Sequence, residues 1–118
     1  NQKDEQHRRA IEMATATSAR IFTTRWVLME LADGFCRSAD RGGVAAFIRG
    51  LEQNSHMTII PASNEIFDLG LELYESHSDK HWSLTDCTSF AMMRKYLITE
   101  ALTGDHHFEQ AGFAALLK

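Results

Sequence analysis

The sequence predicts an α/β domain in which helices cover both faces of a mainly parallel sheet, a three-layer α/β/α arrangement. Short runs of β-branched and aromatic residues alternate with longer segments whose apolar residues recur at helical spacing. Strands joined through helices pair in parallel, because each helix returns the chain to the edge where the previous strand began. With 118 residues, 44% of them hydrophobic, the chain can bury one core, so we expect residues 1–118 to form a single domain.

The amino-terminal half is predicted to contain three helices and two strands. Thr23 or Thr24 is placed to cap the second helix, and Gly42 with Gly43 interrupts the helical pattern that follows. Pro61 ends the second strand, because its nitrogen cannot donate a hydrogen bond to a sheet. The expected elements are a helix over Lys3–Ala19, a strand over Arg20–Thr23, helices over Trp26–Arg37 and Val44–Gln53, and a strand over Met57–Ile60.

The carboxyl-terminal half is predicted to contain two helices and two strands. Ser63 can cap a helix whose first turn carries Glu65, where the helix dipole favours an acidic side chain. The segment from Ser76 to Ser83 is polar and is expected to be a loop. The elements expected after it are a helix from Thr85 or Asp86 to about Tyr96, a strand over Ile98–Leu102 and a strand over Phe113–Leu117.

The net charge of −4 at pH 7 argues against a protein that binds nucleic acid through a broad basic surface. It is compatible with a metal-dependent nuclease, because in such enzymes bound cations meet the phosphate. The chain has no apolar run long enough to cross a bilayer and no apolar segment at its start. We therefore expect a cytoplasmic protein with no membrane role.

The two cysteines, Cys36 and Cys87, fit neither a disulfide framework nor a paired-cysteine zinc site. Each falls within a predicted helix and close to a phenylalanine. We therefore expect both cysteines to be reduced core residues.

Two acidic elements near the carboxyl end are the main candidates for a functional site. Asp86 opens a predicted helix, and Asp105 follows a short apolar run, so an α/β sheet would bring both to one edge. Clustered carboxylates of this kind suit a divalent metal. Asp86 is explained equally well as a helix cap. His106 and His107 after Asp105 suggest either metal binding or a polar turn, and we favour the turn because adjacent side chains diverge.

Three segments together resemble the PIN domain, the nuclease fold of VapC-type toxins in toxin and antitoxin pairs. Thr24–Glu30 resembles the helix that supplies the family's second acidic residue, and Leu102–Phe108 resembles the segment that supplies the fourth. Trp82–Cys87 resembles the third acidic motif and is the most specific match. Because Asp4–Ala19 also resembles the family's first helix, the likeness spans nearly the whole chain.

The resemblance implies hydrolysis of RNA phosphodiester bonds with Mg²⁺ or Mn²⁺. Asp86 and Asp105 would be direct metal ligands, and Glu30 would complete the metal's shell. The hydroxyls of Ser89 and Thr103 would orient those ligands, which keeps metal geometry fixed. The implied partners are an RNA substrate, an antitoxin protein with a segment over the acidic site, and a second copy in a homodimer. Without the resemblance, Glu30 would be interpreted as a solvated residue.

One feature of the family is absent from the sequence. The family opens with a hydrophobic strand that ends in aspartate and lies in the middle of the sheet, and no such strand precedes Asn1. We therefore expect a fragment, in which this central first strand and its carboxylate were cut away or are supplied by a separate chain. This leaves a second function open, that of a non-catalytic PIN-like interaction module or inactive fragment.

Overall fold

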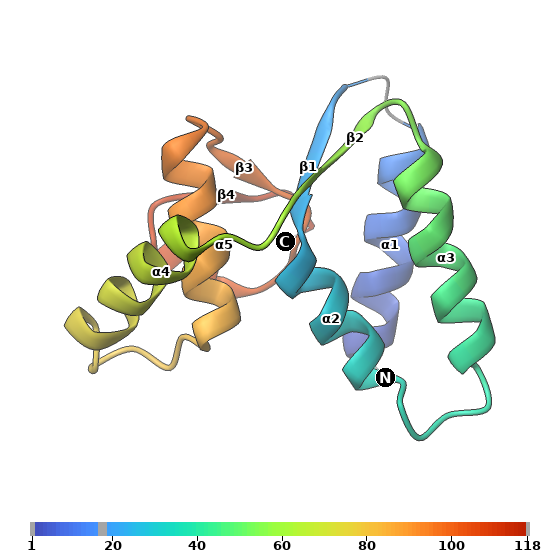
Figure 1. The fold of residues 1–118 in the computed structure, drawn as a ribbon, viewed down its shortest axis with the longest axis horizontal. Helices are drawn as coiled ribbons and strands as arrows, with labels where there is room; N and C mark the ends of the chain where they lie inside the picture. Colours follow the sequence, from blue (N-terminus) through green and yellow to red (C-terminus); the bar gives the residue numbers. More distant parts are fainter. Residues whose placement is uncertain (1, 17–18, 118) are drawn as a thin grey trace.

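The computed structural model describes residues 2–16 and 19–117, in which helices alternate with short strands (Figure 1). The α/β class predicted from the sequence is therefore confirmed. In chain order the elements are α1 (Gln2–Ala16), β1 (Ile21–Thr24), α2 (Arg25–Gly34), α3 (Arg41–Gln53), β2 (Met57–Ile60), α4 (Asn64–Ser76), α5 (Leu84–Lys95), β3 (Glu100–Ala101), α6 (His106–Gln110) and β4 (Ala114–Ala115).

The strands pair in parallel, as predicted, but they form two separate two-stranded sheets. β1 pairs with β2 in a register that runs from Ile21 opposite Met57 to Thr24 opposite Ile60. β3 pairs with β4, with Glu100 opposite Ala114. Figure 1 shows β3 and β4 on the side of α4 and α5, and β1 and β2 between that side and the helices α1 and α3. Within residues 2–16 and 19–117, no strand joins the two sheets.

β3 is shorter than the strand predicted over Ile98–Leu102, because the backbone N–H of Ile98 bonds to the end of α5. Leu97 adopts a left-handed conformation with φ of 57°. The N–H of Ile98 then donates to the carbonyl of Met93 at 2.8 Å, and the N–H of Leu97 donates to that of Arg94 at 3.3 Å. This pair of bonds is a Schellman motif, which ends the helix and occupies the amide that a strand would have used.

The predicted caps Thr24 and Ser63 are confirmed. Thr24 Oγ1 accepts the N–H of Val27 at 3.1 Å, and Ser63 Oγ accepts that of Ile66 at 3.2 Å. The predicted start of α5 at Thr85 or Asp86 is wrong, because Ser83 caps that helix and Asp86 is its third residue.

Two expectations for the amino-terminal half are also wrong. Gly42 and Gly43 lie within the first turn of α3, which begins at Arg41. A Cβ at Gly43 would lie 3.0 Å from Oδ1 of Asp40, the residue before α3, so glycine at this position leaves room for the Asp40 side chain. Helix α2 ends at Gly34, so Cys36 is exposed in the following turn, whereas Cys87 is buried in α5 as expected.

Helix α5 forms the centre of the hydrophobic core. All seven residues from Cys87 to Met93 are buried, so this helix has neighbours on every side. Ile60, Ile66 and the carboxyl-terminal part of α5 form one core cluster. Its partly buried neighbours include Phe22 from β1 and Trp26 from α2, so the core connects the amino-terminal elements to α4 and α5.

Helices α4 and α5 lie side by side and approach closely at Gly70 (Figure 1). A Cβ at Gly70 would lie 2.9 Å from Cγ2 of Thr88, and 3.0 Å from both the backbone nitrogen and the Cα of Thr88. Because two of these atoms belong to the backbone, a side-chain rotation cannot make room. Only glycine fits this helix contact without moving the helices.

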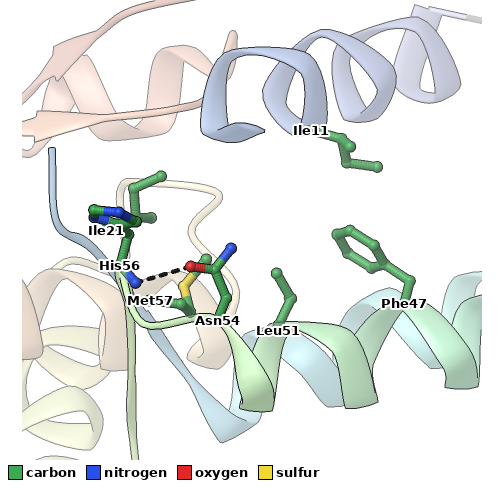
Figure 2. Close-up of a pocket in the computed structure, with 7 residues that line it drawn as sticks. All are labelled: Ile11, Ile21, Phe47, Leu51, Asn54, His56 and Met57. Atoms are coloured by element: carbon green, nitrogen blue, oxygen red, sulfur yellow. Dashed lines mark hydrogen bonds between the residues drawn. The ribbon is translucent and has the colours of Figure 1, made fainter. Parts of the chain in front are cut away.

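Packing is looser between α1 and α3. Figure 2 shows Ile11 of α1 facing Phe47 and Leu51 of α3 across a gap. The cavity there measures about 30 Å³. A hydrogen bond of 3.1 Å from Arg9 to the carbonyl of Leu117 ties α1 to the carboxyl-terminal segment. In the described part of the chain, no helix is both long and apolar enough to cross a membrane.

We predict that Gly70→Ala lowers the free energy of unfolding by about 1–3 kcal/mol, because the new methyl group overpacks the contact between α4 and α5. Gly50→Ala is the matched control, since Gly50 is also helical but has no atom within 4 Å of its Cβ position. That variant should gain about 0.5–1 kcal/mol from helix propensity. Urea unfolding followed by circular dichroism measures both, and an equal response of the two variants contradicts the contact.

We predict that Leu97→Gly raises the free energy of unfolding by about 1 kcal/mol, because a left-handed conformation is costly for residues with a Cβ. Leu97 is 86% exposed, so the change removes little buried surface. Gly112 occupies the equivalent position after α6, with φ of 98°, and Gly112→Ala should lower stability by a similar amount. Thermal unfolding compares the pair, and a destabilised Leu97→Gly variant contradicts this account.

Candidate active site

Asp86 lies in the first turn of α5, where the helix leaves the core. Ser83 Oγ accepts the N–H of Asp86 at 3.0 Å, and Oδ2 of Asp86 accepts the N–H of Ser83 at 3.1 Å. This reciprocal capping box fixes the orientation of the carboxylate. Asp86 is therefore the third-residue partner in the capping box of Ser83, not the N-cap itself, and it is a preorganised acidic group on a rigid helix.

Asp105 is held by the residues on both sides of it. It is the N-cap of α6, and its Oδ1 accepts the N–H of His107 at 2.9 Å. The N–H of Asp105 donates to Oγ1 of Thr103 at 3.1 Å. Thr103 therefore orients the backbone of Asp105, and the first turn of α6 orients its carboxylate.

His107 lies between the two carboxylates. Its Nδ1 is 3.2 Å from Oδ2 of Asp86 and 3.4 Å from Oδ1 of Asp105. The structure therefore places Asp86 of α5 and Asp105 at the start of α6 on the same imidazole nitrogen, and their roles as metal ligands stay predictions. A cationic or hydrogen-bond donor group between two carboxylates offsets their mutual repulsion.

Aromatic packing sets the position of α6 relative to α5. Phe108 packs edge-on against the buried ring of Phe90, with centroids 4.9 Å apart. Trp82 is buried before α5, and its Nε1 donates to Oε1 of Gln110 at 3.0 Å. Because these contacts join the two helices on either side of the acidic groups, the core determines the distance between Asp86 and Asp105.

The prediction that His106 and His107 form a polar turn is wrong. We favoured a polar turn with diverging side chains, but both residues belong to α6 and their ring centroids are only 4.5 Å apart. One ligand atom each from Asp105, His106 and His107 lies within 4.8 Å of the others. The sequence signal for the close approach of these side chains was Asp105 itself, because an N-cap side chain folds back over the first turn of its helix.

Two further candidates lie on neighbouring elements. Glu30 is exposed on α2, a helix that packs against α5. Ser89 lies one turn after Asp86 and is only 5% exposed, and its hydroxyl has no hydrogen-bond partner among the described residues. The metal-shell roles of these residues stay predictions.

The surroundings of Asp86 also affect the adjacent thiol. Burial raises the pKa of Cys87, and the negative charge of Asp86 raises it further. A raised pKa keeps the thiol protonated, and a protonated buried thiol is a poor nucleophile. Cys87 is therefore a packing residue beneath the acidic site.

A known protein family matches most of this chain. Residues 2–114 match the PIN domain family. The chain belongs to the PIN domain family. No curated protein matches it.

Among solved structures, the chain is similar to the VapC20 toxin of Mycobacterium tuberculosis, described as a toxin that cleaves the sarcin-ricin loop. The two are 24% identical, and the match covers 98% of this chain and 88% of that chain with a TM-score of 0.83. At this level of identity the likeness shows the fold, which is the PIN fold that the sequence motifs predicted.

The donor set at this PIN-domain site fits a divalent cation. Oxygen atoms of Asp86 and Asp105 approach the same imidazole nitrogen from two helices, and both side chains are partly exposed. Hard cations such as Mg²⁺ take carboxylate oxygens and keep several waters, which needs this kind of partial exposure.

We predict that iodoacetamide at about pH 8 alkylates Cys36 in the native protein and leaves Cys87 unmodified until the chain is denatured. Cys36 is exposed, whereas Cys87 is buried and has a raised pKa. Mass spectrometry of peptides from native and denatured samples measures the two sites separately. Equal native alkylation of both cysteines contradicts the assignment of Cys87 to the core.

Proposed function

We propose that this chain is the ribonuclease of a toxin and antitoxin pair and hydrolyses RNA phosphodiester bonds with Mg²⁺ or Mn²⁺. The observation that carries the proposal is the meeting of Asp86 and Asp105 around Nδ1 of His107 within a PIN fold. Carboxylates from separate helices at one polar, partly exposed place suit metal-assisted phosphate chemistry better than a structural role.

In this proposal Asp86 and Asp105 hold the cation, and Glu30 on α2 completes the set. When bound, the cation supplies positive charge that stabilises negative charge on the phosphate. The capping box keeps Asp86 in place, and Thr103 fixes the backbone at Asp105. Such supporting contacts hold metal ligands in productive geometry, so the chain's own contribution is orientation of the acidic groups.

The family likeness also supports the proposed partners. We propose an antitoxin segment that covers the acidic site, a homodimer and a cytoplasmic location. Because the similar VapC20 toxin is described as cleaving the sarcin-ricin loop, an RNA oligonucleotide with that loop is the first substrate to test.

We predict that Asp86→Asn and Asp105→Asn each weaken Mn²⁺ binding about tenfold or more, or about 1.4 kcal/mol, and abolish metal-dependent RNA cleavage. Asparagine keeps an oxygen that can accept the N–H bonds of Ser83 and His107, so both variants should fold. Calorimetric titration measures binding, and gel analysis of the RNA measures cleavage.

Asp68→Asn is the control, because Asp68 is an exposed carboxylate on α4. It should bind Mn²⁺ and cleave RNA as the parent chain does. Unchanged Mn²⁺ binding in both site variants, with folding verified by circular dichroism, overturns the assignment of the site. Intact metal binding without cleavage of RNA favours the alternative, a non-catalytic PIN-like interaction module.

A further inference from the structure

We propose that His106 and His107 are metal ligands together with Asp105, so that this site prefers a later transition-metal ion such as Co²⁺ or Zn²⁺ to Mg²⁺. The inference rests on the proposed function for its location, because it adds nitrogen ligands to the same acidic site. It concerns the ligand set and the identity of the ion.

The distances among the three side chains fit a single ion. Nδ1 of His106 lies 3.6 Å from Oδ1 of Asp105, and Nδ1 of His107 lies 3.4 Å from the same oxygen. Ligand atoms about 2 Å from one ion in a tetrahedral arrangement lie about 3.3 Å from one another. The two separations between the Asp105 carboxylate and the imidazoles are therefore within a few tenths of an ångström of that geometry, and all three ligand atoms lie within 4.8 Å of one another.

The backbone explains why these consecutive side chains converge. Asp105 has extended backbone angles, φ of −77° and ψ of 124°, whereas His106 and His107 begin the helix. The Asp105 carboxylate folds over that first turn and accepts the N–H of His107. The change of conformation at Asp105 places Oδ1 within 3.6 Å of Nδ1 in both rings, whose planes are inclined by 53°.

The exposure of the ligands gives an ion a route from solvent and a buried anchor. The His106 side chain is 64% exposed, whereas that of His107 is 18% exposed and lies beside Asp86. Oδ2 of Asp86, at 3.2 Å from Nδ1 of His107, borders this group but lies outside the three ligand atoms that are within 4.8 Å of one another. One carboxylate and two imidazoles are a mixed oxygen and nitrogen set.

Ligand chemistry then sets the preference among ions. Imidazole nitrogen suits zinc, copper, nickel and iron sites, whereas Mg²⁺ binds oxygen almost exclusively. Affinity of a given mixed site rises from Mn²⁺ through Co²⁺ to the later metals. Removal of an imidazole should therefore weaken Co²⁺ binding and leave Mg²⁺ binding nearly unchanged.

The test is a calorimetric titration of tag-free protein with Co²⁺, Zn²⁺ and Mg²⁺, together with the visible absorption spectrum of bound Co²⁺, which reports nitrogen ligands directly. In His106→Ala, Co²⁺ affinity should fall about tenfold and the Co²⁺ spectrum should change, while Mg²⁺ affinity stays within about twofold. His107→Ala provides a second variant. His56→Ala is the control, because His56 is exposed in the turn before β2 and lies outside the group.

An unchanged Co²⁺ affinity and spectrum in both His106→Ala and His107→Ala overturns the inference. Mg²⁺ binding as tight as Co²⁺ binding in the parent chain also overturns it. RNA cleavage is measured separately from metal binding, so failure of the proposed function and failure of this inference are distinguishable. If Co²⁺ binding depends on the histidines but no RNA is cleaved, only the proposed function is overturned. If RNA cleavage depends on Asp86 but metal binding does not depend on the histidines, only this inference is overturned.

Discussion

The burial of α5 on all sides is the constraint on which the rest of the structure depends. A helix with seven consecutive buried residues leaves no face for solvent, so its neighbours must fit it closely. Gly70 lets α4 approach the backbone at Thr88, and the Thr88 hydroxyl donates to the carbonyl of Thr85 at 2.7 Å. A buried hydroxyl without that bond would be costly. A capping box closes one end of the helix and a Schellman motif closes the other.

Helix α5 fixes the positions of the residues in the acidic site. Asp86 lies where α5 emerges from the core, one residue before the fully buried Cys87. The ring of Phe90 supports Phe108, and Trp82 binds Gln110, so the same core positions α6. A short helix such as α6 has little stability of its own in water. Its packing against α5 therefore maintains the geometry of Asp105, His106 and His107.

The site combines two kinds of donor. The carboxylates of Asp86 and Asp105 supply negative charge, and His107 lies between them with a nitrogen that can donate a proton or bind an ion. His106 is the more exposed of the pair and lies on the solvent side of Asp105. This arrangement connects the proposed ribonuclease chemistry with the proposed choice of metal, since both depend on the charge and ligand type gathered at the starts of α5 and α6.

Local patterns in the sequence determined the α/β class, the caps Thr24 and Ser63, and the strand Met57–Ile60, because periodicity and capping act over a few neighbouring residues. Motifs along the chain also indicated the PIN family and selected Asp86 and Asp105.

Tertiary structure alone decided which cysteine is buried, where the strands end, and that the parallel strands form two pairs. It also decided that His106 and His107 converge on Asp105, and that His107 reaches Asp86. The physical reason is that burial and approach depend on the packing of α6 against α5 through Phe90 and Phe108, and no local sequence pattern encodes that distance.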